Sequence, residues 1–385
     1  MKIAAVTLYP DKKAGSALYS HKLYAEISKY CTVVILSDNE ANHKDNVKMV
    51  NAWRRKSLLM PFQLFKHILR QKPHICHFQI EYKTFNDNAA ISAIENLLLL
   101  LLTRITSINI LVTLHGVIPF ATTEKVFERK ATAVFYNVPL RIFYKALEFS
   151  SKKIIVHTNL MENILRAYGL SNNKIAVIPH GVDRARQFYG GDKKEGLTVL
   201  FHGFIRPSKG LEWLIKAMQN VAELHPRVKL IIAGETPHQE KRKGHFHISQ
   251  LRREIRCLQL ENHVKIIKKF LSENELEKLI LESDVLVLPY IDNFFEASGA
   301  LARVMDYGKP LICTKIPRFL GDLKNGEDCI MVSPCDAQKL AEAVIELVQN
   351  EKLRKKIGEN LKEKASCRYW DILAKEYVQL YEENA

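Results

Sequence analysis

The chain of 385 residues is long enough for two or three domains, and its 47% hydrophobic and 26% charged residues are ordinary for a globular protein. Lys and Arg outnumber Asp and Glu by 57 to 42, and this net charge of +15 suits nucleic acid, an anionic membrane surface or anionic small substrates. The composition argues against a membrane span, because the one lipid-like run, Leu97–Leu102, is far shorter than the roughly 20 residues needed. That run is expected to be a buried helix.

The seven cysteines are scattered, without a CxxC pair or a Cys/His spacing typical of zinc. They are expected to be reduced thiols, several of them buried, which favours a cytoplasmic location. The opening segment Met1–Pro10 becomes polar too early for a signal peptide and is expected to contain the first strand.

Short β-like runs alternate with amphipathic runs through the first half of the chain, which is typical of parallel α/β sheets. A polar, glycine-rich stretch at 184–196 follows the turn residues Pro179–Asp183 and is the best candidate for an interdomain linker. Strands are predicted at Lys2–Thr7, Thr32–Leu36, His74–Phe78, Asn109–Leu114, Lys153–His157 and Ile175–Ile178, with helices such as Ala17–Ser28 and Asn159–Ala167 between them.

The alternation restarts after this stretch. Strands are predicted at Leu197–His202, Lys229–Ala233, Val264–Ile267, Val285–Leu288 and Leu311–Thr314, with a helix at Leu211–Leu224. The pattern predicts an α/β protein of two doubly wound domains facing a cleft, with ligands bound beyond the carboxyl ends of the strands.

The sharpest local signal is the segment His202–Leu211, which joins a predicted strand to a predicted amphipathic helix. Arg206 and Lys209 lie beside the start of this helix, where cations oppose the helix dipole unless an anion lies between them. A diphosphate would be neutralised by the two cations and capped by backbone N–H groups. The alternative is a pair of merely exposed surface cations.

The segment Phe295–Thr314 has a similar character. Ser298-Gly299 leads into a predicted helix with one apolar face and with Gly308 as its stop. Free N–H groups at the helix start could bind a phosphate or a sugar hydroxyl, and Glu296 could accept hydrogen bonds from a vicinal diol such as a ribose. An acid that simply caps a helix is the structural alternative.

Two features of the first half are candidate ligand contacts. Gly15-Ser16 opens a predicted helix after the first strand, and this helix start is free of bulky side chains. His115-Gly116 ends the fourth predicted strand, where a side chain could face a bound ligand. A lone histidine is, however, more often a structural residue.

Taken in order, these segments resemble the retaining, metal-independent glycosyltransferases of the GT-B fold, family four, also called group 1. The resemblance covers nearly the whole chain, and HFQIEY and TLHG are similar to segments of a mannosyltransferase-like branch. It also rests on residues 156–183, on VKLIIAGE (228–235), on residues 264–290 and on YWDILAKEYVQLYEE (369–383).

The resemblance implies two Rossmann-like domains, an N-terminal acceptor-binding domain at 1–184 and a C-terminal nucleotide-sugar-binding domain at 185–365. A helix within 366–385 would cross back to the first domain. The implied activity is transfer of a hexose from a nucleotide-diphosphate sugar, with GDP-mannose weakly favoured over a UDP-sugar, to a glycan, lipid-linked or small-molecule acceptor, as in polysaccharide biosynthesis. No metal and no cofactor are implied, because cations and helix dipoles stabilise the departing diphosphate.

Carried over position by position, the resemblance implies that Arg206 and Lys209 bind the diphosphate and stabilise the leaving group. Glu296 would hold the ribose, and His115 would face the transferred sugar as a catalytic residue. Further donor contacts would come from Gly15, Ser16, Gly203, Glu235, Ser298, Gly299 and Ala300.

Two positions depart from the family pattern. Arg303 stands nearest the place of a usual second glutamate, and Phe204 follows Gly203 where many members have an arginine. Both features resemble a branch whose motifs read like GFIRPxKG and ASGxLA, which keeps the first acid and the phosphate loop.

Three other hypotheses stay open: a sugar-nucleotide epimerase of the same fold, a relative that binds nucleotide sugars without catalysis, and a nucleic-acid-binding protein. Nucleic acid is disfavoured because no binding module is recognisable and the basic clusters at 54–56, 241–243 and 354–356 are dispersed. The basic clusters of the first domain are expected to attract an anionic acceptor or an anionic membrane surface, which would give peripheral contact at the inner membrane face.

Overall fold

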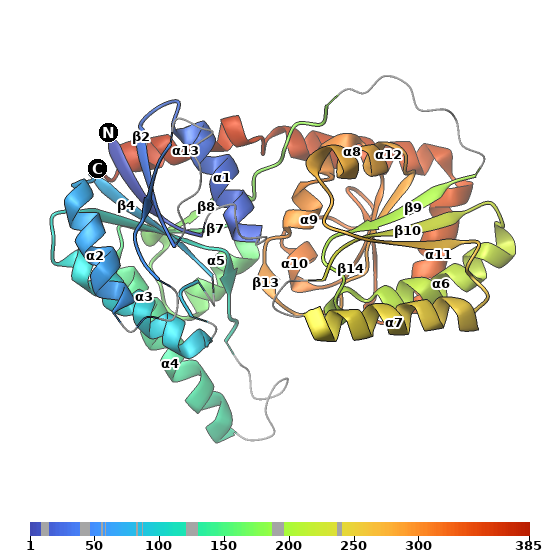
Figure 1. Ribbon diagram of the computed structural model, residues 1–385, viewed down its shortest axis with the longest axis horizontal. Helices are drawn as coiled ribbons and strands as arrows, with labels where there is room; N and C mark the ends of the chain where they lie inside the picture. Colours follow the sequence, from blue (N-terminus) through green and yellow to red (C-terminus); the bar gives the residue numbers. More distant parts are fainter. Residues whose placement is uncertain are drawn as a thin grey trace. The chain divides into compact units, whose positions relative to one another are not determined.

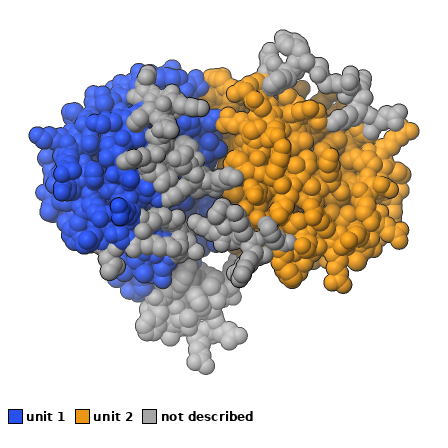
Figure 2. All heavy atoms as spheres, viewed as in Figure 1, with its two compact units in different colours: residues 1–181, 294–297, 370–385 blue, residues 182–293, 298–369 orange. Residues whose placement is uncertain are grey.

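The computed structural model describes two compact units (Figure 2), of which unit 1 comprises residues 1–181, 294–297 and 370–385 and unit 2 comprises 182–293 and 298–369. Most of the predicted linker, residues 187–195, and residues 55–56 of one basic cluster lie outside the described residues, as do the side chains of the cluster 241–243. The described residues are 1–8, 15–38, 47–54, 57, 59–81, 84–86, 88–120, 130–186, 196–236 and 241–385, without the side chains of 130–136, 241–243 and 245.

Unit 1 is built on a seven-stranded parallel sheet of order β3-β2-β1-β4-β5-β7-β8 (Figure 1). The order reverses between β1 and β4, and this topological switch point is where such sheets bind ligands. The strands are β1 (Lys2–Val6), β2 (Thr32–Ser37), β3 (Lys48–Asn51), β4 (Ile75–Ile80), β5 (Asn109–Leu114), β7 (Lys153–Val156) and β8 (Ile175–Val177). The helices are α1 (Gly15–Ile27), α2 (Met60–Gln71), α3 (Ala89–Arg104), α4 (Lys130–Ser150), α5 (Asn159–Ala167) and α13 (Trp370–Glu382).

Both faces of this sheet are covered, which is why its central strands read as continuous apolar runs. Alternate residues of β1 belong to two separate cores. Ala4 and Val6 face the core that contains α2, α3 and α4, whereas Ile3 and Ala5 face the core that contains α1 and α13. The predicted strands of this half are confirmed with small shifts of their ends. Strand β3 was missed because it is a short edge strand with polar ends.

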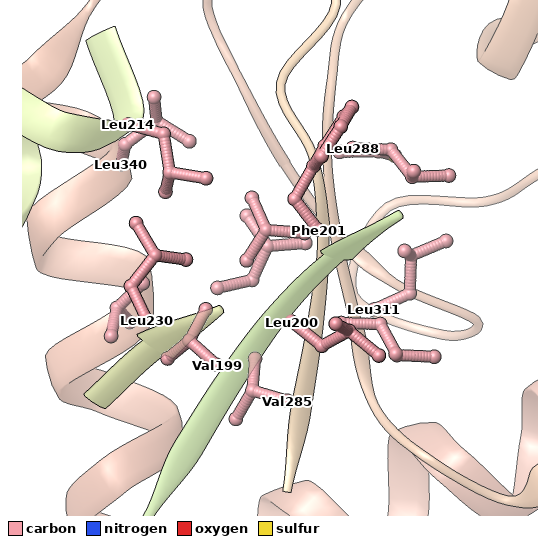
Figure 3. Packing of buried hydrophobic residues seen from close by; sticks show 14 of the residues in the cluster. Val199, Leu200, Phe201, Leu214, Leu230, Val285, Leu288, Leu311 and Leu340 are labelled. Atoms are coloured by element: carbon pink, nitrogen blue, oxygen red, sulfur yellow. The ribbon is translucent and has the colours of Figure 1, made fainter. Parts of the chain in front are cut away.

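Unit 2 repeats the architecture with a six-stranded parallel sheet of order β11-β10-β9-β12-β14-β15. Figure 3 shows Leu214 of α6 and Leu340 of α11 packed together in its core beside the sheet residues. The strands are β9 (Thr198–His202), β10 (Lys229–Gly234), β11 (Val264–Lys268), β12 (Val285–Leu288), β14 (Leu311–Thr314) and β15 (Ile330–Val332). The helices are α6 (Leu211–Leu224), α7 (Lys241–Cys257), α8 (Glu273–Leu281), α9 (Gly299–Ala302), α10 (Pro317–Leu320), α11 (Ala337–Gln349) and α12 (Glu351–Ser366).

The last helix, α13, belongs to unit 1. Its residues Trp370, Tyr377 and Tyr381 are buried in the same core as Tyr19 and Tyr24 of α1. The predicted fold class of two Rossmann-like domains is thus confirmed. The division between the units falls at 181/182 rather than at the predicted 184/185, residues 366–369 group with unit 2, and the inclusion of 294–297 in unit 1 was not predicted.

The run Leu97–Leu102 does lie in a helix, α3, but the expectation that it is buried is only half right. Leu99 and Leu100 are fully buried, whereas Leu98 and Leu101 are 37% and 43% exposed. A run of leucines that winds around a helix must place some of its members on the outer face, because only one side of α3 contacts the sheet.

Gly181 and Trp370 are in close contact within unit 1, and this contact yields a stability prediction. A Cβ on Gly181 would lie 2.3 Å from Cε3 of the Trp370 ring. We predict that Gly181→Ala lowers the free energy of unfolding by about 1–3 kcal/mol, because the indole must shift from its packed position. Chemical denaturation measures this. Gly15→Ala is the matched control, since a Cβ there meets no atom within 4 Å, and equal losses in the two variants would contradict the packing argument.

Among the described residues, His77, His157 and His202 are almost fully buried, and no carboxylate is hydrogen-bonded to any of the three. In unit 1, His77 contacts the hydroxyls of Tyr24, Tyr381 and Thr113, and His157 donates from Nδ1 to the carbonyl of Ile178. In unit 2, His202 donates from Nε2 to the carbonyl of Ala300. Burial lowers the pKa of His77, His157 and His202 to about 3 in each case, and the charge of Arg303 adds to the effect on His202.

These neutral histidines predict acid sensitivity. In the unfolded chain a histidine has a pKa of about 6.5, so below that pH the unfolded chain binds protons that the folded chain does not. We predict that the free energy of unfolding has its full value above about pH 6.5. As the pH falls from there toward the folded pKa, each histidine should lower this free energy by up to about 1.4 kcal/mol per pH unit. Chemical denaturation between about pH 7 and pH 5 measures the slope. His157→Gln should flatten it, and a pH-independent stability would contradict the burial argument.

Candidate functional site

The loop after β9 in unit 2 is held by the backbone of the loop after β10. The N–H of Ile205 donates to the carbonyl of Glu235 at 2.9 Å. Gly203 and Gly234 have φ angles of +130° and +156°, and a Cβ on Gly234 would lie 1.8 Å from the carbonyl oxygen of Gly203. Only glycine fits such an approach. The contact brings Glu235 beside the segment that carries Arg206.

The other end of this loop is held against the segment that follows β12. Gly210 has a φ of +63° and precedes α6, and a Cβ there would lie 2.1 Å from the carbonyl oxygen of Pro289. The N–H of Ile291 donates to the carbonyl of Ser208 at 3.0 Å. Since β9 and β12 flank the switch point of the sheet, the loop lies where a ligand is expected in this fold.

The two cations of the loop have different surroundings. Arg206 is half-buried, and its guanidinium carbon lies 5.4 Å from the ring centre of Phe204. The Nε of Arg206 is shielded from water and has no hydrogen-bond partner among the described residues. The Nζ of Lys209, by contrast, lies 3.4 Å from the ring centre of Tyr290. An unsatisfied guanidinium donor on a braced loop favours binding of an anion.

Tyr290 is the residue of this site that sequence reasoning missed. It lies directly beyond the carboxyl end of β12, and its hydroxyl is 3.8 Å from where a Cβ on Gly203 would stand. Burial raises the pKa of Tyr290 well above its ordinary value, so the ring is a neutral platform beneath the ammonium of Lys209. Arg318 lies 5.6 Å from the same ring and forms a buried ion pair with Asp292 at 2.8 Å. The signal that could have identified Tyr290 in the sequence is its position after an apolar strand, which is the same signal that pointed to His115.

The helix predicted after Ser298 is much shorter than expected. Helix α9 is a single turn, Gly299–Ala302, and the Oγ of Ser298 accepts the N–H of Leu301 at 3.2 Å. The N–H of Val304 then bonds to the carbonyl three residues back, and the chain continues as a 3-10 turn, Met305–Tyr307, before Gly308. One turn has little helix dipole, so anion binding here would depend on individual N–H groups.

A buried carboxylate accounts for this departure from a regular helix. Asp306 lies in the 3-10 turn and accepts hydrogen bonds from the N–H of Ala185 and from the hydroxyl of Tyr369, both at 2.7 Å. Both partners are distant in sequence, so the apolar periodicity of the segment could not reveal them. The prediction of Gly308 as the stop is confirmed, since it adopts a left-handed conformation with φ of +66°.

Glu296 lies in unit 1, apart from the rest of its motif. Strand β13 (Phe295–Glu296) pairs in antiparallel fashion with β6 (Gly116–Val117), which places Glu296 opposite Gly116 and next to His115 in the ladder. Residues 294–297 therefore bring the acid to the end of β5. Sequence reasoning missed this pairing because two-residue strands carry no recognisable pattern.

His115 is held by side chains on both ring nitrogens. Its Nε2 lies 2.8 Å from the side-chain amide of Gln79, and its Nδ1 lies 3.3 Å from Nε2 of His157. The Oε1 of Gln79 can only accept, so His115 donates from Nε2. The NH₂ group of Gln79 donates to the hydroxyl of Tyr24 at 2.8 Å.

The environment keeps His115 uncharged. Burial lowers its pKa well below the ordinary value, and the neighbouring His157 and His180 lower it further. The ring of Tyr19 in α1 lies 4.8 Å from that of His115, 5.2 Å from that of His157 and 5.1 Å from that of His180. His115 is therefore a positioned neutral ring whose nitrogens are both engaged within unit 1.

The start of α1 offers a further polar group in the same unit. Gly15 has open space where a Cβ would be, and the Oγ of Ser16 is buried without a hydrogen-bond partner among the described residues. Ser16 lies one turn before Tyr19, on the side of α1 that faces the histidines. The loop before Gly15, residues 9–14, lies outside the described residues.

The predicted site residues thus fall into two groups. Unit 1 contains Gly15, Ser16, His115 and Glu296. Unit 2 contains Gly203, Arg206, Lys209, Glu235, Ser298, Gly299 and Ala300.

Within the described part of the chain, no cluster of three or more His, Cys, Asp or Glu side chains is placed to hold a metal ion. No helix among the residues that the structure describes has the length and apolarity to cross a bilayer.

Comparison with known families matches most of the chain in two parts. Residues 31–186 match the family model described as "Glycosyltransferase Family 4", and residues 183–364 match the one described as "Glycosyl transferases group 1". An uncharacterized glycosyltransferase of Methanocaldococcus jannaschii is 26% identical over 249 residues, which cover 60% of each chain. A phosphatidyl-myo-inositol mannosyltransferase of Mycobacterium leprae is 25% identical over 211 residues, or 53% of this chain and 52% of the relative. The chain therefore aligns with little more than half of these relatives' lengths.

Solved structures extend the likeness to the full length of the fold. HepE from Anabaena, in complex with UDP, superposes over the whole of both chains with a TM-score of 0.74 at 15% sequence identity. The resemblance to the family 4, or group 1, glycosyltransferases is thus confirmed by the family matches, and the expected GT-B fold by the superposition. The chain belongs to the family 4, or group 1, glycosyltransferases and has their GT-B fold.

Proposed function

We propose that the protein transfers a hexose from a nucleotide-diphosphate sugar to an acceptor hydroxyl. The observation that carries the proposal is the unsatisfied guanidinium donor of Arg206, on a loop braced by glycine contacts at the switch point of unit 2. A diphosphate would supply the missing acceptor, and Lys209 would add a second cation. Family membership supports the same chemistry.

In the proposed reaction the bond between the anomeric carbon and the diphosphate oxygen breaks, and the acceptor oxygen bonds to that carbon on the same face. The acceptor proton passes to the departing diphosphate. Arg206 and Lys209 would stabilise the charge that develops on the leaving group, and no metal is needed for this role. Arg303, in place of an expected acid, adds positive charge near the end of β9, where it affects His202.

In unit 1, Glu296 would accept hydrogen bonds from the ribose, and Gly15 and Ser16 would contact the donor. His115 would contact the transferred sugar, which requires that one of its ring nitrogens exchange its present partner. A mannosyl donor is favoured by the M. leprae relative's name, whereas UDP in the HepE structure supports a UDP-sugar. The acceptor would be a glycan, a lipid-linked molecule or a small molecule, and the reaction would take place in the cytoplasm.

Lys209 provides the first test. We predict that Lys209→Ala lowers turnover by about 100-fold or more with little change in melting temperature, because the leaving group loses one of its two cations. A panel of GDP-, UDP- and ADP-sugars screened by thermal shift and then by hydrolysis identifies the donor for the assay. Lys216→Ala is the matched control, since Lys216 lies on a tryptophan ring, 5.0 Å from the centre of Trp213 in α6. Unchanged turnover in Lys209→Ala would refute the diphosphate role.

Glu296 provides the second test. We predict that Glu296→Gln weakens donor binding about tenfold in calorimetry and changes kcat less, because a charged acceptor for the ribose hydroxyls becomes a neutral one. The pairing of β13 with β6 uses the backbone and should survive the change. Glu382→Gln, at an exposed glutamate of α13, is the control. If the variant bound the donor as tightly as the unsubstituted protein does, the assignment of Glu296 to the ribose would be wrong.

A further inference from the structure

The outer face of helix α3 is aliphatic where a surface helix usually carries polar side chains. Between Ile91 and Leu101 every exposed side chain is aliphatic, and these residues recur at intervals of three and four, which makes one continuous stripe. The stripe consists of Ile91, Ile94, Leu98 and Leu101 and continues in Ile105, which is 80% exposed. The opposite, buried face combines Leu99 and Leu100 with the polar residues Ser92, Glu95, Asn96 and Thr103. A surface helix usually places its polar side chains on the outer face instead.

The stripe is not isolated, because α3 packs between α2 and α4 on one face of unit 1 (Figure 1). Both neighbours expose large apolar side chains as well. They are Leu59, Phe62 and Leu69 in and just before α2, and Val138, Ile142 and Phe149 in α4. A group of exposed apolar side chains as large as this on neighbouring helices marks an interaction site.

The charges on this face have one sign. The exposed ionisable side chains on the described parts of the three helices are cations, and none is Asp or Glu. Glu95 is buried, and Glu148 is mostly covered and forms an ion pair with Lys145 at 2.8 Å. The exposed cations are Lys66, Arg70, Arg104 and Arg141.

A small basic cavity adjoins the ends of α3 and α4. Its volume is about 290 Å³, and Arg104, Lys152 and Lys174 contribute to its lining. Ser150 also lines it, and the Oγ of this residue is buried without a hydrogen-bond partner in the described part of the chain. The size and charge suit an anionic headgroup that could accept a hydrogen bond from the serine.

We propose that this aliphatic and basic face of α2, α3 and α4 docks unit 1 onto the surface of an anionic lipid bilayer. A membrane interface offers apolar depth for the stripe and negative charge for its cations. A second copy of the chain fits less well, because a two-fold contact through this face would bring the cations of both copies together. The proposal does not depend on sugar transfer, and its residues lie outside the basic clusters at 54–56, 241–243 and 354–356.

Flotation with lipid vesicles tests the proposal without any turnover, so failure of the proposed activity would leave the result interpretable. Vesicles of phosphatidylcholine with about one quarter phosphatidylglycerol should bind the full chain, and pure phosphatidylcholine should bind it more weakly. Raising the salt from about 0.1 M to about 1 M should weaken the binding. No binding to the anionic vesicles would overturn the proposal.

Two sets of variants assign the binding to this face. The triple variant Ile94→Gln, Leu98→Gln and Leu101→Gln should lower vesicle affinity by at least about tenfold. The pair Arg104→Gln and Arg141→Gln should lower it about tenfold and reduce its salt dependence. All five changes are at exposed positions, so folding should be kept and can be checked by circular dichroism.

Matched controls come from exposed residues of unit 2. Leu224→Gln with Leu320→Gln removes side chains that are 63% and 53% exposed, and Lys352→Gln with Lys356→Gln removes two exposed cations. Both control pairs should bind vesicles like the parent. Parental binding by the triple variant would overturn the proposal. A lipid-independent dimer that the triple variant abolishes would also overturn it and would assign the face to a second copy.

Discussion

The tightest of the glycine contacts in the candidate site is that of Gly234 with Gly203, where an added Cβ would lie 1.8 Å from a carbonyl oxygen. This approach lets the loops after β9 and β10 run together beyond the sheet. The position of Arg206 depends on this contact and on a second one at the far end of the same loop, where Gly210 lies against Pro289. A long cationic side chain is useful in recognition only when its backbone is held, since ordering a free loop would oppose binding.

Unit 1 buries many polar aromatic rings in an uncharged state. Histidines and tyrosines share hydrogen bonds from Thr113 through His77 and Tyr24, and from Gln79 through His115 to His157. The ring nitrogens and hydroxyls of these two networks have neutral partners, which avoids the cost of an isolated buried charge. The arrangement orients His115 just beyond the carboxyl end of β5. The buried neutral histidines are also the reason for the acid sensitivity that we predict.

Much of the fold and part of the site follow from local patterns. Continuous apolar runs predicted the central strands, because both faces of those strands are covered in the fold. Cations beside a predicted helix start predicted that the segment His202–Leu211 binds an anion. Patterns of this kind fail where an element is very short or lacks periodicity, as in β3, β15 and the pairing of β13 with β6. They fail as well where a distant partner decides the conformation, as Ala185 and Tyr369 do for the turn at Asp306.

By itself the sequence determined the fold class and the cationic loop, because both depend on spacing along the chain, and its motifs resemble the family that the comparisons confirm. Tertiary structure alone decided that Glu296 lies opposite Gly116, that Tyr290 supports Lys209 and that the outer face of α3 is aliphatic. These features depend on which surfaces the sheet leaves covered or open. Leu97–Leu102 illustrates the difference: composition marks the run as apolar, but only packing against the sheet determines which of its side chains face water.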